Sequence, residues 1–511
     1  MSIFKACDIR GAYPGELDEA LYAGLGRAVG SVLREASDAP RVVVAGDVRV
    51  STPALKAALI EGLAATGCRV SDIGMAPTPV AYFAARRLGP DGVAIVTASH
   101  NPAGDNGLKL MLGPMPITEE QMARVEQALA SRRFATGRGS ITTLSVNGDY
   151  VAWLCAGAAR GNGLRIVLDC GNGTYSDLAP RVLRHLGYGV AELFCTPDGT
   201  FPNRPPDPSV PENLGALREA VVRAGAAIGV ALDGDGDRVA IADDRGRPLT
   251  GDQAIILLAQ HLLTSPLPPS SPLPLGEGRV RDPGAGAAPS TGVPHPHPLP
   301  KGEGVREAEA AGKRGGEKVV LDLKCSKAVL DAVAAGGGVP VLERSGHAFI
   351  RARMLAEDAL FGGELSGHFF YRELGGGDDG LYSVLRAAEL AQQSRQPISA
   401  LVDAMPRYAI TPDIRVPYEA ADGPQRLDEI AAAAQACPER SRRGEVTRLD
   451  GVRVAYPDGW GLARCSVTEP LLTFRFEAYA GSPRAVAERF LASAPDLLRA
   501  VLARLDALET V

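Results

Sequence analysis

The chain has 511 residues, of which 45% are hydrophobic and 22% charged, and its formal net charge is −6. These ordinary values indicate a globular protein of about three or four domains, and they give no support for binding nucleic acid or an anionic membrane through the whole surface. No apolar run is long enough to span a bilayer, the N-terminus lacks a secretory signal pattern, and the eight cysteines form no CxxC pair. We therefore expect free thiols and a cytoplasmic location.

Strands and helices alternate in the first segment of the chain. Apolar strands are predicted at residues 41–46, 69–73 and 92–97. Two helices separate them, the first capped by Ser51 and the second beginning at Thr78. This β-α-β-α-β order predicts a largely parallel sheet covered by helices.

The same alternation recurs twice farther along the chain, and the C-terminal part then differs. In each repeat a polar, glycine-rich stretch follows a strand, at the strand end where ligands bind in open α/β sheets. The C-terminal part has a strand–strand–helix pattern that predicts a smaller α+β domain. The predicted elements are strands at residues 164–169, 227–232, 318–323, 339–343, 453–455 and 472–477, and helices at 177–185, 326–335 and 483–493.

Three aspartates directly follow the predicted strand at residues 227–232. Asp233, Asp235 and Asp237 alternate with glycines, so the carboxylates can face one side while the backbone turns tightly. Clustered carboxylates repel one another unless a cation neutralises them, and an all-oxygen ligand set suits Mg²⁺. A calcium loop is an alternative, but its sixth position would be Arg238 instead of Gly, and a strand precedes it. A plain acidic surface turn is the remaining alternative.

Ser99 stands at the end of another predicted strand, within Thr-Ala-Ser-His-Asn-Pro at residues 97–102. A hydrolase nucleophile is one interpretation, yet no G-x-S-x-G turn is present and the adjacent His100 is poorly placed as a base. A serine that carries a phosphoryl group needs a hard cation beside it, and the aspartates and Lys109 provide the surrounding charges. The two segments together predict phosphoryl transfer through a phosphoserine.

Two further segments are candidate substrate contacts. Glu364, Ser366 and His368 alternate, so their side chains can converge on one ligand. A carboxylate and a hydroxyl suit vicinal sugar hydroxyls, and a histidine suits proton transfer or a phosphate contact. Residues 464–468, Arg-Cys-Ser-Val-Thr, combine one guanidinium with two hydroxyls, which fits a phosphate cradle. Each segment alone is equally compatible with a polar loop.

Two stretches differ in amino-acid composition from the rest of the chain. Residues 264–317 are rich in Pro, Gly and Ser, a composition that cannot bury enough apolar surface to offset the entropy of ordering. We expect a disordered insertion there, in which His295 and His297 are ordinary polar residues. Residues 438–445 are expected to form a charged surface loop.

Together these segments resemble the α-D-phosphohexomutase family, most closely its bacterial phosphomannomutase/phosphoglucomutase members. The resemblance extends from residue 3 to about residue 478, without the insertion. Its motifs are Cys-Asp-Ile-Arg-Gly at 7–11, Thr-Ala-Ser-His-Asn-Pro at 97–102, Asp-Gly-Asp-Gly-Asp-Arg at 233–238, Asp-Leu-Lys-Cys at 322–325, Ser-Gly-His at 345–347, Gly-Glu-Leu-Ser-Gly-His at 363–368 and Gly-Asp-Asp-Gly at 377–380.

The family's architecture agrees with the fold class read from the residues. That class is α/β, with three successive α/β domains whose sheets are mixed and largely parallel, and a smaller C-terminal α+β domain. The resemblance implies that the four domains surround a central cleft. The expected domains are residues 1–142 with the phosphoserine loop, 143–249 with the metal-binding loop, 250–403 with the sugar-binding loop and the insertion, and 404–511 with the phosphate-binding segment.

The resemblance also implies a role for each candidate residue. Ser99 is the phosphorylated serine and, with the three aspartates, a ligand of one Mg²⁺. Lys109 is a candidate acid/base. The implied catalytic residues are Arg10, Ser99, Lys109 and His368; the implied substrate contacts are Arg238, Lys324, His347, Glu364, Ser366, Arg464, Ser466 and Thr468; the implied metal ligands are Ser99, Asp233, Asp235 and Asp237.

The implied reaction interconverts hexose 1-phosphate and hexose 6-phosphate, with mannose, glucose or both as the sugar. Phospho-Ser99 donates its phosphoryl group to give a hexose 1,6-bisphosphate, which turns around and returns its other phosphoryl group to Ser99. Glucose or mannose 1,6-bisphosphate is the expected activator. The expected partner is a small phosphosugar, without nucleic acid or membrane, and the expected assembly is a monomer or homodimer.

Two positions depart from the family pattern. Relatives often have Tyr where this chain has Cys7, and Asn where it has Val467. These departures leave open the alternative that the protein binds sugar phosphates but catalyses weakly. Two further alternatives are a phosphoglucosamine mutase, which shares the same chemistry, and a phosphatase that uses the same serine. Leu365 in the sugar loop favours the glucose/mannose branch.

Overall fold

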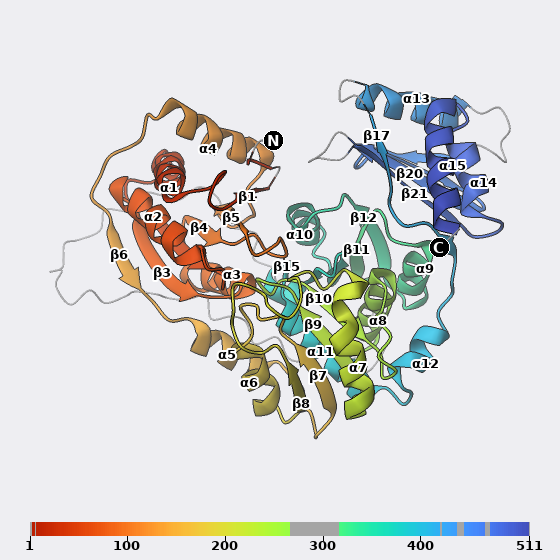
Figure 1. The fold of residues 1–511 in the computed structure, drawn as a ribbon, viewed down its shortest axis with the longest axis horizontal. Helices are drawn as coiled ribbons and strands as arrows, with labels where there is room; N and C mark the ends of the chain where they lie inside the picture. Colours follow the sequence, from red (N-terminus) through yellow and green to blue (C-terminus); the bar gives the residue numbers. More distant parts are fainter. Residues whose placement is uncertain are drawn as a thin grey trace.

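The computed structural model describes residues 3–5, 7–265, 316–418, 422–436, 444–465 and 471–509 (Figure 1). Nearly all of the predicted insertion, with His295 and His297, lies outside these residues. So do Ser466, Val467 and Thr468 and most of the predicted loop at 438–445, of which Glu445 begins a strand.

The first sheet is mixed and contains the strands predicted for the first segment. Its elements are β1 (Asp8–Ala12), α1 (Glu19–Arg34), β2 (Arg41–Gly46), α2 (Thr52–Ala65), β3 (Arg69–Met75), α3 (Thr78–Leu88), β4 (Gly92–Val96), β5 (Asp105–Leu112), α4 (Glu119–Ser131) and β6 (Ser140–Thr143). The strand order is β1-β5-β4-β2-β3-β6. The strands from β4 to β6 in this order are parallel, whereas β5 runs antiparallel to both β1 and β4.

Ser51 does not act as the predicted cap. Helix α2 begins directly after it, but its side chain makes no capping hydrogen bond. The Ser51 hydroxyl instead accepts a hydrogen bond of 2.7 Å from Nδ2 of Asn106 on β5. The prediction placed the helix start correctly and missed this competing partner, which ties α2 to β5.

The second sheet holds the aspartate motif in a turn between two antiparallel strands. Its elements are α5 (Asn147–Ala156), β7 (Arg165–Asp169), α6 (Leu178–His185), β8 (Gly189–Leu193), the short helix η1 (Pro211–Leu214), α7 (Gly215–Ala224), β9 (Ile228–Leu232) and β10 (Val239–Ala242). The order is β10-β9-β7-β8, with β9, β7 and β8 parallel and β10 antiparallel to β9.

The third sheet follows the same plan with a meander at one edge. Its elements are α8 (Gly251–Thr264), β11 (Lys318–Asp322), α9 (Lys327–Ala335), β12 (Val339–Glu343), α10 (His347–Ala356), β13 (Phe361–Gly363), β14 (Phe369–Tyr371), η2 (Arg372–Leu374), β15 (Gly377–Asp378), α11 (Gly380–Gln393) and α12 (Ile398–Asp403). The order is β12-β11-β13-β14-β15. Strands β12, β11 and β13 are parallel, and the last three strands are antiparallel.

The fourth sheet is antiparallel throughout and is covered by helices. Its elements are β16 (Ala409–Ile410), β17 (Ile414–Pro417), α13 (Gly423–Ala436), β18 (Glu445–Thr447), β19 (Val452–Tyr456), β20 (Gly459–Cys465), β21 (Leu471–Ala478), α14 (Pro483–Phe490) and α15 (Pro495–Glu509). The order is β16-β21-β20-β19-β18, and β17 also pairs with β21. Three α/β units with mixed sheets and one smaller α+β unit confirm the predicted fold class.

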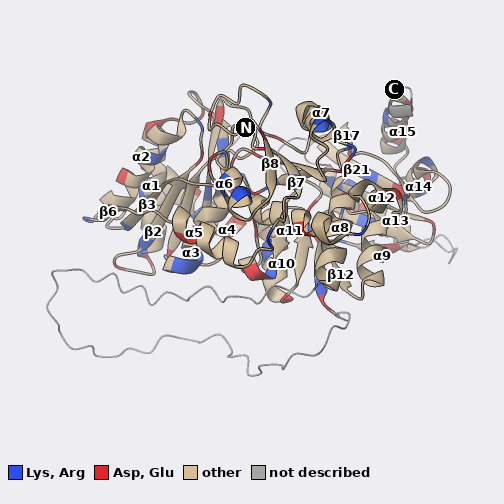
Figure 2. Cartoon of the chain, turned by 90° about the horizontal axis from the view of Figure 1, so that it is seen from below, with Lys and Arg blue, Asp and Glu red and all other residues tan. Residues whose placement is uncertain are grey.

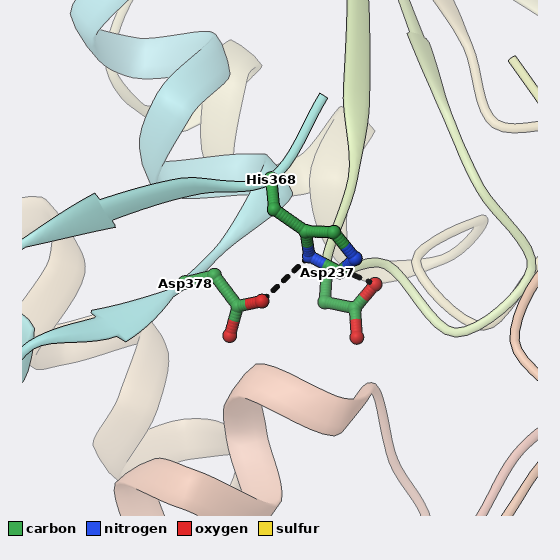
Figure 3. Close-up of side chains that lie close together, drawn as sticks. All are labelled: Asp237, His368 and Asp378. Atoms are coloured by element: carbon green, nitrogen blue, oxygen red, sulfur yellow. Dashed lines mark hydrogen bonds and ion pairs between the residues drawn. The ribbon is translucent and has the colours of Figure 1, made fainter. Parts of the chain in front are cut away.

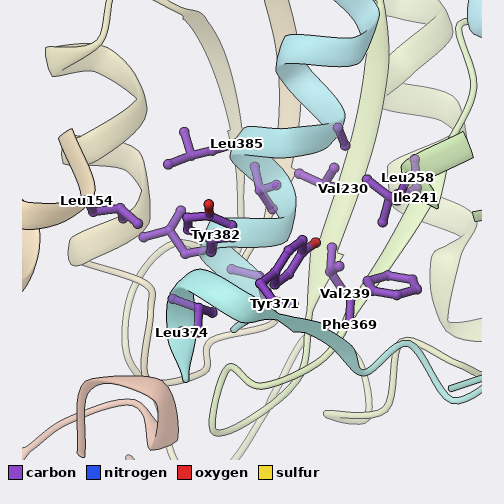
Figure 4. Packing of buried hydrophobic residues seen from close by; sticks show 14 of the residues in the cluster. Leu154, Val230, Val239, Ile241, Leu258, Phe369, Tyr371, Leu374, Tyr382 and Leu385 are labelled. Atoms are coloured by element: carbon purple, nitrogen blue, oxygen red, sulfur yellow. The ribbon is translucent and has the colours of Figure 1, made fainter. Parts of the chain in front are cut away.

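One continuous hydrophobic core joins the first three sheets. It includes Phe83 on α3, Tyr150 on α5 and Leu321 on β11, all buried. Figure 4 shows the part where Val230, Val239 and the third unit's Tyr371, among others, pack together. Such burial stabilises a fold by about 25 cal/mol per Å² of apolar surface.

Positions of Lys and Arg and of Asp and Glu are interspersed along the described elements (Figure 2). Among the described helices, none is long and apolar enough to cross a bilayer.

Candidate active site

Ser99 lies in the turn between β4 and β5 and has a strained backbone. Its φ angle is 54°, in the left-handed region that side chains other than glycine rarely adopt. The buried Arg49 guanidinium holds this turn, because it donates to the carbonyls of Ser99 at 2.9 Å and of Asn101 at 2.6 Å. Strain that the surroundings enforce is typical of functional sites.

The antiparallel strands β5 and β1 bring Lys109 and Arg10, respectively, to Ser99. Lys109 pairs with Ile95 on β4 and with Asp8 on β1, so it lies on an interior strand of the sheet, the strand that follows the serine turn. Arg10 on β1 donates to Asn101 Oδ1 at 2.7 Å and to the carbonyl of Ala98 at 3.3 Å. Two cationic side chains therefore flank the serine turn.

The three aspartates converge in the turn between β9 and β10. One oxygen from each of Asp233, Asp235 and Asp237 lies within 4.8 Å of the others, and all three residues are buried. Asp233 Oδ1 accepts from the backbone amides of Gly236 at 2.9 Å and Arg238 at 3.1 Å. Gly236 has a φ of 83°, which a residue without Cβ adopts at low cost.

The serine turn and the aspartate turn meet directly, although they come from different sheets. Ser99 Oγ donates to Asp233 Oδ2 at 3.0 Å. Lys109 Nζ donates to Asp235 Oδ2 at 2.7 Å and to Asp237 Oδ2 at 2.5 Å. The sequence-predicted phosphoserine, cation and carboxylates thus lie at one point.

The remaining carboxylate oxygens suit a hard cation. Oδ1 of Asp235 and Oδ1 of Asp237 are buried and have no hydrogen-bond partner among the described residues. A buried charged oxygen without a partner is costly, and a divalent cation with oxygen ligands would remove that cost. The residues present therefore fit Mg²⁺ beside Ser99.

Charges in this cluster shift one another's pKa values. Burial, followed by Asp235 and Asp237, raises the pKa of Asp233 well above its ordinary value. Burial also acts to raise the pKa of Asp235, but the Lys109 ammonium helps to make the net direction downward. Burial disfavours the charged form of Lys109, yet the paired aspartates raise its pKa well above the usual value. Lys109 is therefore a cation here, and its acid/base role stays a prediction.

The sugar-loop candidates lie in a tight turn between β13 and β14. The Glu364 amide donates to the His368 carbonyl at 3.0 Å, and the Gly367 amide donates to the Glu364 carbonyl at 3.0 Å. The strand-like alternation expected for Glu364, Ser366 and His368 is wrong, because the chain reverses there. Oε2 of Glu364 and Oγ of Ser366 are buried without a hydrogen-bond partner among the described residues, so both can accept or share a ligand hydroxyl.

His368 turns toward the aspartate cluster (Figure 3). Its Nδ1 lies 2.6 Å from Asp378 Oδ2 and 3.7 Å from Asp237 Oδ1. Arg238 Nε, which can only donate, lies 2.8 Å from His368 Nε2. Nε2 is then the acceptor, and Nδ1 carries the proton that it donates to Asp378. The ring of His347 lies beside it, with centroids 6.2 Å apart.

Of the remaining candidates, Lys324 reaches from the third unit to the fourth, and Arg464 lies on β20 within the fourth. Lys324 Nζ is 3.6 Å from Asp413 Oδ2, and Arg464 Nη1 is 3.1 Å from Asp450 Oδ2. Since Ser466 and Thr468 are outside the described residues, Arg464 alone represents the predicted phosphate cradle.

Comparison with known proteins assigns this architecture to a family. Models of phosphoglucomutase/phosphomannomutase α/β/α domains I, II and III match residues 1–136, 149–246 and 305–408. The chain belongs to the phosphoglucomutase/phosphomannomutase family. The predicted resemblance is thereby confirmed.

Individual members of the family are similar over nearly the whole chain. A phosphomannomutase/phosphoglucomutase of Pseudomonas aeruginosa is 34% identical over 480 residues, which cover 93% of this chain and 92% of the relative. A phosphoglucomutase of Neisseria gonorrhoeae is 35% identical over 482 residues and 93% of each chain. The crystal structure of a phosphoglucomutase/phosphomannomutase family protein from Burkholderia thailandensis has a TM-score of 0.79 at 33% identity, with 98% of this chain and 97% of that chain covered.

Sequence reasoning missed three residues that build this family site. Thr78 Oγ1 donates to Asp235 Oδ2 at 2.6 Å, although its only predicted role was to begin a helix. Arg49 and Asp378 were also given no role. Asp378 belongs to the recognised Gly-Asp-Asp-Gly motif, which was a usable signal, whereas a buried arginine that binds backbone carbonyls leaves none in the sequence.

Proposed function

We propose that this protein is a phosphohexomutase that interconverts hexose 1-phosphate and hexose 6-phosphate through phospho-Ser99. The observation that carries the proposal is the contact between Ser99 Oγ and Asp233 in a cluster of three carboxylates. The names of the Pseudomonas and Neisseria relatives support the same reaction class.

In this reaction the residues mainly position the reacting groups and balance charge. The phosphoryl group on Ser99 Oγ passes to the free C1 or C6 hydroxyl of the sugar phosphate, and the second phosphoryl group later passes back to the same oxygen. A bound Mg²⁺, held by the three aspartates and by phosphorylated Ser99, would neutralise charge on the transferring group. Lys109 and Arg10 flank the turn and add positive charge where the phosphoryl group moves.

Sugar recognition is assigned to the turn at Glu364 and Ser366. Their buried, unpartnered oxygens can bind neighbouring hydroxyls, which would relieve the cost of burying them. Arg238, His347 and Lys324 complete the proposed substrate contacts.

The non-reacting phosphate is assigned to Arg464 with Ser466 and Thr468. A hexose 1,6-bisphosphate that reorients within the site needs one position that binds the non-reacting phosphate and one position beside Ser99 for the reacting phosphate. The same bisphosphate, of glucose or mannose, is the proposed activator, because it can restore the phosphoryl group on Ser99.

The finer points of the proposal concern substrate and setting. We infer a glucose or mannose phosphate as the partner, a monomer or homodimer, and a cytoplasmic location. The seven described cysteines are free thiols, which supports a reducing compartment.

A coupled assay tests the proposal. Glucose 1-phosphate, mannose 1-phosphate and glucosamine 1-phosphate are each offered with Mg²⁺ and a trace of the matching bisphosphate. We expect turnover of the glucose and mannose compounds. Turnover confined to the glucosamine compound would show that the protein is a phosphoglucosamine mutase. Release of inorganic phosphate would indicate a phosphatase, and binding without turnover would indicate weakened catalysis.

A further inference from the structure

Two thiols of the second unit lie almost in bonding contact. Cys170 follows the end of β7 and is buried, and Cys195 follows the end of β8 and is half-buried. Their Sγ atoms are 3.1 Å apart. A disulfide bond is about 2.05 Å long, so a shift of about 1 Å would bring the two sulfurs to bonding distance.

The backbone already holds these two segments in register. Strands β7 and β8 are parallel neighbours, and Asp169 pairs with Leu193. The Cys170 amide donates to the Leu193 carbonyl at 3.1 Å, and the Asn172 amide donates to the Phe194 carbonyl at 2.8 Å. Neither strand has to leave its sheet for the sulfurs to meet.

The segment after Cys170 supports the aspartate turn. The Gly173 amide donates to the Cys170 carbonyl at 2.8 Å. Thr174 then binds the carbonyl of Gly234 twice, through its amide at 2.9 Å and its hydroxyl at 2.8 Å. A movement of Cys170 is therefore passed to the turn that carries Asp233.

The segment after Cys195 reaches the serine turn. It leads to Phe201, whose ring lies 5.3 Å from the guanidinium carbon of Arg49. Arg49 in turn donates to the Ser99 carbonyl at 2.9 Å. The segment after Cys170 thus contacts the aspartate turn directly, and the segment after Cys195 reaches the serine turn through Arg49.

We propose that Cys170 and Cys195 form a redox-sensitive dithiol, whose reversible oxidation to a disulfide slows turnover by shifting the Asp233 and Ser99 turns relative to each other. The chemical partner is a small-molecule disulfide such as oxidised glutathione. This modification site is independent of which sugar the enzyme takes.

The reaction is ordinary thiol–disulfide exchange. Cys195 is the accessible thiol, whereas burial and then its hydrogen bond with Cys195 raise the pKa of Cys170 well above the usual value. Cys195, once deprotonated, attacks one sulfur of the small disulfide and releases one small thiol. Cys170 then loses its proton, attacks Cys195 Sγ and releases the second small thiol. The two protein thiols are oxidised, and the small disulfide is reduced to two thiols.

Peptide mapping tests the bond itself. The full-length protein is incubated with oxidised glutathione, alkylated without reduction and digested. We expect one linked peptide pair containing Cys170 and Cys195, lighter by two hydrogen atoms than the separate peptides and lost on treatment with dithiothreitol. Mixed glutathione adducts on Cys195 with no linked pair would overturn the proposal.

Activity measurements test the consequence. We expect the oxidised wild type to lose turnover severalfold and to regain it with dithiothreitol. Cys195→Ser should keep its activity under the same oxidation, while Cys155→Ser, which changes another half-buried thiol, should behave like the wild type. A linked pair with unchanged turnover, or equal inactivation of Cys195→Ser, would overturn the regulatory part. If the protein is inactive before oxidation, peptide mapping still tests whether Cys170 and Cys195 form the disulfide.

Discussion

The first three units and the C-terminal unit are built on different principles. The first three share one apolar core, which continues from Phe83 through Tyr150 to Leu321, and the first unit has a second core of its own around Leu55 and Leu108. The C-terminal unit has a core of its own around residues such as Phe474, and a small cluster of Leu323, Trp460 and Leu462 joins it to the third unit. The chemistry of phosphoryl transfer needs fixed distances, and the proposed catalytic groups all lie in the jointly packed part.

Polar contacts at the two junctions repeat this contrast. Between the second and third units, Asp379 accepts from the hydroxyls of Tyr150 at 2.6 Å and Tyr175 at 3.0 Å, and all three are buried. The Gly380 amide beside it donates to the Gly236 carbonyl at 3.0 Å, within the aspartate turn. The junction with the C-terminal unit has one buried carboxylate, Glu477, and ion pairs such as Lys324 with Asp413 and Arg475 with Asp252. The three side chains named for the first junction are buried, whereas the partners in these ion pairs are partly exposed.

Ser99→Ala tests the jointly packed site most severely. Without the hydroxyl no phosphoryl group can be carried, so we expect kcat/KM to fall by several orders of magnitude. Peptide mass spectrometry of active wild type should find phosphate on Ser99. Ser140→Ala, an exposed serine on β6, serves as the control and should behave like the wild type. A Ser99→Ala protein with wild-type turnover would contradict the proposed mechanism.

Glu364→Ala tests recognition next to that site. Loss of a charged hydrogen-bond acceptor costs about 1.5–3 kcal/mol, which corresponds to about 10- to 150-fold in kcat/KM. Because glucose and mannose share the hydroxyls in question, we expect equal losses with both phosphosugars. The wild type should discriminate between them by no more than about tenfold. A variant whose kcat/KM falls for one phosphosugar and not for the other would show that Glu364 contacts the C2 hydroxyl, at which the two sugars differ.

Asp379→Asn tests the junction between the second and third units. Burial, partly offset by hydrogen bonds from Tyr150 and the Tyr382 amide, raises the pKa of Asp379 to about 6. The folded protein therefore holds this proton more tightly than the unfolded chain, whose aspartates titrate at about 3.9. The stabilising contribution is complete below about pH 4 and is lost as the pH rises to about 6, and it amounts to about 3 kcal/mol.

The measurement for Asp379 is the difference in unfolding free energy between wild type and Asp379→Asn from pH 4 to pH 7. We expect the wild type to lose about 2 kcal/mol relative to the variant over this range, because the unfolded aspartate is already about half ionised at pH 4. A difference that does not change with pH would show that Asp379 is ionised in the folded protein throughout.

Glu477→Gln tests the sparser junction. The carboxylate accepts from the Lys327 amide at the start of α9 at 2.9 Å, from Trp460 Nε1 at 2.6 Å and from the Ser326 hydroxyl. An amide offers one acceptor oxygen in place of two, so we expect about 1–3 kcal/mol to be lost at this contact. KM for the phosphosugar should rise while kcat changes little. A fall in kcat with unchanged KM would place the effect in the jointly packed part.

Deletion of residues 268–314 should have the smallest effect, because the Pro, Gly and Ser composition of this segment predicts an insertion that buries little apolar surface. Loop length changes the closure entropy by only about 0.6 kcal/mol per doubling. We expect nearly unchanged kcat/KM and thermal midpoint, with a Gly/Ser replacement of equal length as the control. An insoluble or inactive deletion variant would show that the segment is structural.

The parts that sequence predicted best were those that local patterns encode. Apolar runs followed by turn residues placed β2, β4 and β12, and alternating Asp and Gly predicted the convergence of Asp233 with its neighbours. Strand β5 was missed because its first half is polar and Lys109, polar and yet buried, interrupts the apolar residues of its second half. The turn at Glu364 was missed for a related reason, since backbone hydrogen bonds within a hairpin decide it. Contacts such as Thr78 with Asp235 join residues far apart in the chain, and no local pattern reports them.

The separate core of the C-terminal unit has an evolutionary consequence. A unit that satisfies its own apolar surface can be exchanged between related proteins without repacking its neighbours, provided that the few contacts around Glu477 and Trp460 are kept. Selection can then alter the proposed phosphate-binding segment around Arg464 by recombination or by drift within that unit. Ser99 and the aspartate turn belong to units that share one core, so neither unit can be exchanged without repacking the others.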